Sequence, residues 1–141
     1  MTPDQIKAIQ ESFAKVAPIS EQAAALFYGR LFEIAPSLKP LFRGDMQEQG
    51  KKLMATLAVV VNGLANLETI LPAASALAKR HVAYGVTAGD YVPVGEALLW
   101  TLDRGLGAQW TPELAVAWAA AYGVLSEFMI GEAYGRSAAA E

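Results

Sequence analysis

Apolar residues recur along this chain at intervals of three and four positions, the spacing of one face of an α-helix. The pattern is clear over residues 6–16, 53–64 and 114–129. No segment shows the sustained alternation of apolar and polar residues that is typical of a half-buried β-strand. The sequence therefore predicts an all-α fold.

Capping residues and helix breakers divide this pattern into segments. Thr2-Pro3 and Thr111-Pro112 each place a side-chain cap before a proline at the first helical position. Prolines interrupt the first third of the chain, and glycines mark the later corners. We expect helices at residues 3–17, 20–35, 36–42, 46–65, 70–83, 90–106 and 112–134. With 141 residues, no repeat and no long linker, the chain is expected to form one domain, residues 1–141.

Composition and charge exclude several classes of function. The net charge of −3 leaves no basic stripe of the kind that binds nucleic acid. The absence of cysteine excludes disulfides, thiolate catalysis and zinc–cysteine sites, and makes the cytoplasm the expected location. The longest apolar run, residues 114–125, is shorter than the roughly 20 residues that span a bilayer. We therefore expect no membrane span, and we see no secretory signal at the N-terminus.

The chain contains one histidine, His81, which follows Lys79 and Arg80. A zinc site with three or four ligands would have to be built almost wholly from carboxylates. No serine has the surroundings of a nucleophile elbow, so a hydrolase triad is not indicated. Taken alone, His81 is more simply explained as a surface or core residue than as a metal ligand.

Longer segments change this interpretation. The run LFYGRLFEIAPSLKPLF at 26–42 resembles the B and C helices of globins, and KRHVAYGV at 79–86 is similar to the end of their F helix. Residues 94–123 resemble the G and H helices of neuroglobin-like and bacterial single-domain globins. The resemblance covers nearly the whole chain. It implies the globin fold, a three-on-three helical sandwich of helices A, B, C, E, F, G and H, with one haem b.

The resemblance assigns a role to each face of that haem. It makes His81 the proximal ligand of the iron and places Phe42 against the porphyrin edge. On the distal face it places Tyr28 with Gln49, a pair carried by similar bacterial globins and flavohaemoglobins. Leu53 is four residues after Gln49, so both side chains share one helix face. Without the resemblance, an ordinary core residue is an equally good interpretation of Phe42, and an exposed helix residue is an equally good interpretation of Gln49.

Three further cofactor contacts are expected at Lys52, Leu77 and Tyr91. Lys52 would reach a haem propionate, although a lysine that only contacts solvent is an equally good interpretation of this residue. Tyr91 resembles a tyrosine that joins the proximal histidine to a glutamate in flavohaemoglobins. That glutamate position falls on Ala133, with Glu132 one residue away and about 100° round the helix. We therefore do not expect the complete proximal network.

These residues are compatible with more than one function. The first hypothesis is reversible binding of oxygen and other diatomic gases, including nitric oxide and carbon monoxide. The second is a nitric oxide dioxygenase, which would depend on an external reductase because the chain has no reductase domain. A haem-free helical interaction protein is disfavoured because His81, Phe42, Tyr28 and Gln49 occur together. A gas sensor is disfavoured because 141 residues leave no room for an output domain.

We expect neither nucleic acid nor a membrane as a partner, and either a monomer or a weak homodimer. The tryptophans at positions 100, 110 and 118 are interpreted as packing residues rather than as electron relays.

Overall fold

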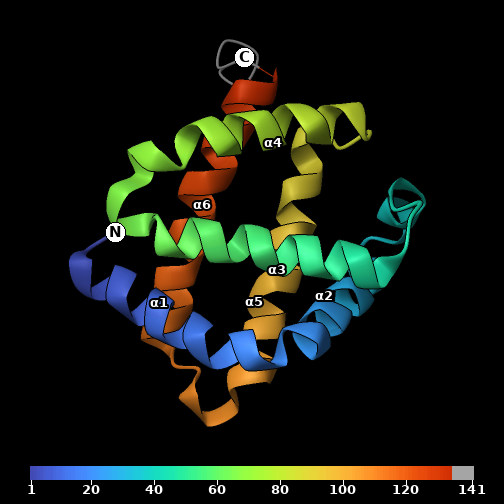
Figure 1. The fold of residues 1–141 in the computed structure, drawn as a ribbon. Helices are drawn as coiled ribbons and strands as arrows, with labels where there is room; N and C mark the ends of the chain where they lie inside the picture. Colours follow the sequence, from blue (N-terminus) through green and yellow to red (C-terminus); the bar gives the residue numbers. More distant parts are fainter. Residues whose placement is uncertain (135–141) are drawn as a thin grey trace.

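The structure is a computed structural model that describes residues 1–134, and its chain folds into helices joined by short 3-10 turns (Figure 1). The α-helices are α1 (Pro3–Val16), α2 (Ser20–Ile34), α3 (Met46–Asn62), α4 (Leu71–Ala83), α5 (Tyr91–Leu106) and α6 (Pro112–Tyr134). The 3-10 turns are η1 (Ala17–Ile19), η2 (Pro36–Leu41), η3 (Leu64–Thr69), η4 (Ala88–Asp90) and η5 (Gly107–Gln109). No strand occurs in this part of the chain, so the all-α prediction is confirmed.

Two of the predicted helices differ from the structure for local reasons. The helix predicted at 46–65 ends at Asn62, because Gly63 caps it and the side chain of Ile70 packs onto that glycine. A Cβ at Gly63 would lie 2.4 Å from Cγ2 of Ile70, a distance that no side chain tolerates. The helix predicted at 36–42 is the 3-10 turn η2, since Pro40 lies inside it and has no N–H to donate.

The helices form two layers. In Figure 1, α3 and α4 run roughly parallel across the front of α5 and α6. Helix α2 packs against α5 and α3, whereas α4 packs mainly against α6. Helices α3 and α4 do not pack closely against each other. Helices α3 and α4 therefore contact different parts of the core.

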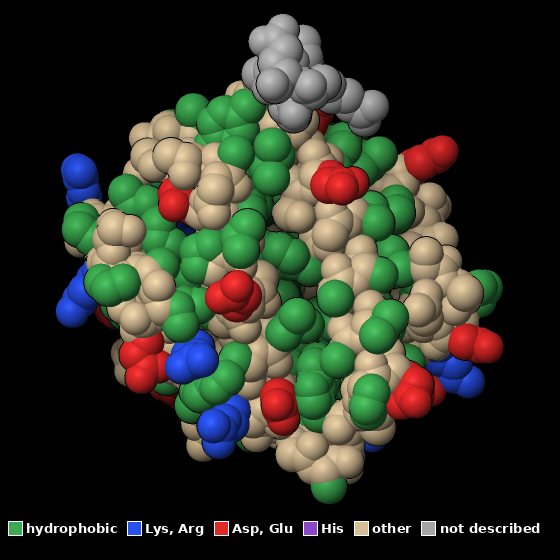
Figure 2. All heavy atoms as spheres, turned by 180° about the vertical axis from the view of Figure 1, so that it is seen from behind, with side chains coloured by type: hydrophobic (Ala, Val, Ile, Leu, Met, Phe, Trp, Pro, Cys, Tyr) green, Lys and Arg blue, Asp and Glu red, His purple; other side chains and the backbone are tan. Residues whose placement is uncertain are grey.

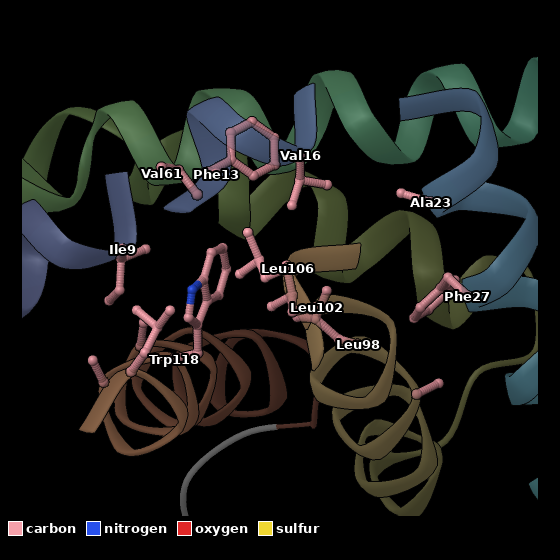
Figure 3. Packing of buried hydrophobic residues seen from close by; sticks show 14 of the residues in the cluster. Ile9, Phe13, Val16, Ala23, Phe27, Val61, Leu98, Leu102, Leu106 and Trp118 are labelled. Carbon is pink, nitrogen blue, oxygen red and sulfur yellow. The ribbon is translucent and has the colours of Figure 1, made fainter. Parts of the chain in front are cut away.

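The larger part of the core joins α1, α2, α3, α5 and α6 (Figure 3). Ile9, Val16 and Leu31 are almost completely buried in it. Trp118 is 3% exposed, and its indole Nε1 donates a hydrogen bond of 2.9 Å to Oγ of Ser12. The indole of Trp118 is buried and its N–H has a hydrogen-bond acceptor, as expected of a tryptophan that serves in packing.

A second, smaller cluster lies between α4, the start of α5 and the end of α6. Its buried members are Ala74, Ala78, Tyr91 and Met129. Half-buried apolar side chains surround them, namely those of Leu77, Val86, Leu125, Phe128, Ile130 and Ala133. The apolar core is thus divided, with α3 on one side of the division and α4 on the other.

Helix α6 is long and apolar enough to cross a membrane when judged by length and composition alone. It packs against α1, α4 and α5, and it buries Leu114, Trp118 and Met129 among them. These contacts with three other helices are typical of a core helix. On the face shown in Figure 2, apolar side chains are interspersed with acidic, basic and polar ones.

Candidate functional site

Three aromatic rings meet between α2 and the end of η2. Tyr28 and Phe32 lie on α2, and Phe42 follows η2. The ring centroid of Tyr28 is 6.0 Å from that of Phe32 and 5.3 Å from that of Phe42. Phe32 and Phe42 are 5.4 Å apart, which closes an aromatic triangle of these three residues. The structure therefore brings Tyr28 and Phe42 into ring contact.

Tyr28 presents its hydroxyl to α3 from a buried position. The residue is 7% exposed, and burial raises the pKa of the phenol. The side chain of Gln49 lowers this pKa by a smaller amount, because its amide lies near the hydroxyl, although the two do not form a hydrogen bond of full geometry. Tyr28 is thus a neutral phenol with a polar amide as its neighbour.

Gln49, Lys52 and Leu53 lie in the first half of α3. The side chain of Asp45 starts this helix by accepting a hydrogen bond of 2.8 Å from the backbone N–H of Gln47. Gln49 and Leu53 are half-buried, and Leu53 packs against the larger core cluster. Lys52 is exposed and forms no ion pair with the residues described. Within residues 1–134, Lys52 therefore has no ion-pair partner that fixes its side chain.

His81 lies in the last turn of α4, where its imidazole is half-buried. Burial lowers the pKa of this ring; the nearby carbonyl of Leu77 raises it, and Arg80 lowers it further. The buried Nδ1 atom has no hydrogen-bond partner of normal geometry, so the Leu77 carbonyl is close to it without forming a full bond. A neutral imidazole is the form that binds a metal.

Tyr91, the first residue of α5, faces His81. The two rings are 6.4 Å apart at an interplanar angle of 27°. Tyr91 is 8% exposed, and its buried hydroxyl also has no hydrogen-bond partner. Its backbone carbonyl accepts a hydrogen bond of 2.6 Å from the hydroxyl of Tyr122, which fixes the start of α5. Gly95 allows this contact, since a Cβ there would lie 2.7 Å from Cε2 of Tyr122.

The segment after His81 is tied to the end of α6. Gly85 adopts a φ of 98°, which turns the chain back so that the N–H of Val86 donates a hydrogen bond of 3.0 Å to the carbonyl of His81. The hydroxyl of Tyr134 donates to the carbonyl of Val86. Tyr134 thus holds the turn that follows the histidine.

Replacing Tyr134 by phenylalanine is expected to loosen this turn. The Val86 carbonyl would lose its donor, a loss worth about 1 kcal/mol, or a factor of about five in an equilibrium. We expect the amide of Val86 to exchange its hydrogen about fivefold faster in Tyr134→Phe, measured by hydrogen–deuterium exchange. Tyr84→Phe is the control, because Tyr84 is 60% exposed. Equal exchange in Tyr134→Phe and the unmodified protein would contradict the anchoring role.

No carboxylate of α6 is among the groups that shift the pKa of His81. Ala133 packs against the second cluster, whereas Glu132 is exposed. Burial, the Leu77 carbonyl and Arg80 shift the pKa of His81, and no acidic side chain contributes to the shift. Among residues 1–134, the groups that act on or contact His81 therefore include the Leu77 carbonyl, Arg80 and the ring of Tyr91.

A cleft of about 340 Å³ lies elsewhere on the described surface, between α1 and the start of α6. Asp4, Lys15 and Glu113 are among its lining residues, and none of the predicted site residues contributes to it. We therefore locate the candidate site by the residues around Tyr28 and His81 and not by this cleft.

The convergent residues fit a flat, apolar, metal-containing cofactor. Two buried polar atoms, Nδ1 of His81 and the hydroxyl of Tyr91, have no partner where the core divides. Such atoms are rare in native structures and call for an explanation. Among residues 1–134, no three histidine or acidic side chains gather as they would around a bare metal ion. These features are compatible with a planar, metal-containing cofactor that would be bound by one histidine, His81.

Comparison with known proteins identifies the family. Residues 25–129 match the family model described as Globin, and this chain belongs to the globin family. It is a haem globin, since haem is the cofactor that the family's fold and its proximal histidine hold.

The chain is similar to several longer proteins. It is 34% identical over 137 residues to the flavohemoprotein of Bordetella parapertussis, a match that covers 93% of this chain and 34% of that protein. It is 36% identical over 117 residues to the flavohemoprotein of Rhizobium meliloti, covering 79% and 29%. The chain thus spans about a third of the length of these relatives.

A solved structure supports the fold. The bacterial globin from Campylobacter jejuni is 26% identical to this chain and superposes with a TM-score of 0.82. The match covers 99% of this chain and 100% of that one. The globin fold predicted from the sequence is therefore confirmed.

Three residues of the site did not emerge from the sequence. Phe32 lies four positions after Tyr28 and so on the same face of α2, a spacing that could have indicated it. Tyr122 and Tyr134 lie on α6 far from His81 in sequence, and only the fold shows what their hydroxyls contact.

Proposed function

We propose that this globin binds haem b through His81 and reversibly binds oxygen, and other diatomic gases, beside Tyr28 and Gln49. One observation supports this most directly. His81 lies on the α4 side of the divided core with its Nδ1 buried and unpartnered, while the phenol of Tyr28 and the amide of Gln49 adjoin the α3 side. We infer that His81 would bind the iron from one wall of the site, and that Tyr28 and Gln49 would donate hydrogen bonds from the other.

The walls supply the contacts that such a cofactor needs. Phe42 and Leu53 would hold it from the larger cluster, and Leu77 and Tyr91 from the second cluster. Haem, when bound, supplies an iron with a coordination position at which a diatomic gas binds. The hydroxyl of Tyr28 and the amide of Gln49 are neutral donors, so they stabilise a polar gas ligand without delivering a charge.

Nitric oxide dioxygenase activity with a separate reductase is the second candidate. Similarity to flavohemoproteins over 93% of the chain favours it. No acidic side chain is among the groups that shift the pKa of His81. This favours the first candidate, reversible gas binding. A proximal carboxylate would make the imidazole a stronger electron donor, and this site offers neutral phenols instead.

Absorption spectra of the haem-loaded protein test the first proposal. We expect a strong Soret band, a ferrous spectrum typical of histidine ligation after reduction with dithionite, and a stable complex on exposure to oxygen or carbon monoxide. A protein that stays colourless when mixed with haem would contradict both candidates.

Turnover separates the two candidates. The oxygen complex is mixed with nitric oxide in the presence of NADH and a separate flavin-containing reductase, the class of electron donor that the dioxygenase would need, and nitrate is counted per haem. About one nitrate per haem indicates a gas-binding protein that reacts once. Many nitrates per haem indicate the dioxygenase.

A further inference from the structure

We propose that Phe32 is a positioning residue of the gas site, which holds the Tyr28 ring against Phe42 and so keeps the Tyr28 hydroxyl beside Gln49. This inference rests on the proposed function, because the hydroxyl acts on the gas only if the gas binds there. Nothing in the resemblance to other globins assigned a role to Phe32.

The aromatic triangle fixes Tyr28 from two directions. Phe32 stacks on the Tyr28 ring with an interplanar angle of 29°, and Phe42 meets that ring edge-on at 67°. Phe32 also meets Phe42 edge-on, at 63°. Phe42 cannot substitute for Phe32, since it touches a different side of the phenol and itself packs against Phe32. Removing Phe32 would leave the Tyr28 ring with a free direction of movement.

The neighbours of Tyr28 determine whether its hydroxyl lies beside Gln49. Phe27 contacts the same ring edge-on at 5.0 Å, so three aromatic side chains touch it. Gln49 is the polar side chain whose influence on the hydroxyl the structure shows. A small rotation of the ring would take this hydroxyl away from the amide and toward apolar surroundings. The geometry of the donor pair therefore depends on how firmly the ring is held.

Phe32 is well placed to act on Tyr28 rather than on folding. It is only half-buried, whereas Phe27 is 4% exposed and Phe13 is 8% exposed in the larger core cluster. A leucine at position 32 would keep most of the apolar contact and lose the flat ring. The main consequence would fall on the orientation of the phenol.

A double-mutant cycle tests this coupling in the haem-loaded protein. We expect Phe32→Leu to raise the oxygen dissociation rate about two- to tenfold, the range that corresponds to aromatic pair energies. In a Tyr28→Phe background the same change is expected to have no effect, since the hydroxyl through which Phe32 acts is gone. Phe32→Tyr keeps the ring and is expected to restore the original rate.

A spectroscopic measurement accompanies the rates. The infrared stretching band of bound carbon monoxide responds to nearby hydrogen-bond donors. We expect Phe32→Leu to broaden or shift it toward the position found in Tyr28→Phe. Phe13→Leu is the control, because Phe13 packs against Trp118 and makes no ring contact with Tyr28. It is expected to leave the band unchanged.

The outcomes separate this inference from the proposed function. If the unmodified protein forms no gas complex, the proposed function fails and the role of Phe32 fails with it. If the complex forms normally and Phe32→Leu changes the rate by the same factor with and without the Tyr28 hydroxyl, only the role of Phe32 is contradicted. An unchanged rate and band in Phe32→Leu would also overturn it.

Discussion

Haem dissociates at least about 100-fold faster from His81→Gly than from the unmodified protein: this is the largest effect that we expect. The reason is that the substitution removes the one imidazole of the chain, and loss of groups outside a coordination shell already costs 10–100-fold in many metal sites. Transfer of haem to an excess of a haem-free acceptor protein, followed in the Soret region, measures the rate.

Added imidazole provides the matching test. Glycine at position 81 leaves room for a free imidazole, so millimolar imidazole is expected to slow the loss of haem in this variant. Val82→Ala is the control substitution, because Val82 is an exposed neighbour on the same helix. Unchanged haem retention in His81→Gly without imidazole would rule out His81 as the ligand.

The second large effect is expected on the α3 side of the site. Tyr28→Phe and Gln49→Leu each remove one hydrogen-bond donor, worth about 1 kcal/mol or more. We therefore expect each variant to release oxygen about fivefold faster or more. Stopped-flow mixing of the oxygen complex with carbon monoxide measures this rate.

A phenol elsewhere in the chain provides the control for this prediction. Tyr84→Phe also removes a hydroxyl, from a residue that is 60% exposed and lies beside His81. It is expected to leave oxygen release unchanged. If Tyr28→Phe and Gln49→Leu both release oxygen at the original rate, the gas does not bind beside this pair.

Most of the fold could be predicted from sequence because its signals are local. Helix starts such as Thr2-Pro3 act through nearby backbone groups, and the structure contains the expected hydrogen bond from the N–H of Gln5 to the Thr2 hydroxyl. The end of α3 was missed because it depends on Ile70 packing onto Gly63. Such contacts between segments leave no periodic pattern.

The residues of the candidate site also differ in whether a local sequence signal could indicate them. The likeness to globins indicated Tyr28, Gln49 and His81. In the structure Tyr28 belongs to the larger cluster and has Gln49 near its hydroxyl, whereas His81 stacks on Tyr91 of the second cluster. The likeness did not indicate Tyr134, whose hydroxyl reaches Val86 only after α6 has packed along α4. Lys52 was predicted as a cofactor contact, and its exposed position in the structure leaves that role untested.

The divided core also bears on the stability of α4. Helices α1, α2, α3, α5 and α6 share the larger cluster, whereas α4 contributes its side chains to the smaller one. A molecule that binds the folded form and not the unfolded form stabilises the folded form. If haem binds through His81, as we propose, its binding free energy would therefore stabilise α4 in particular.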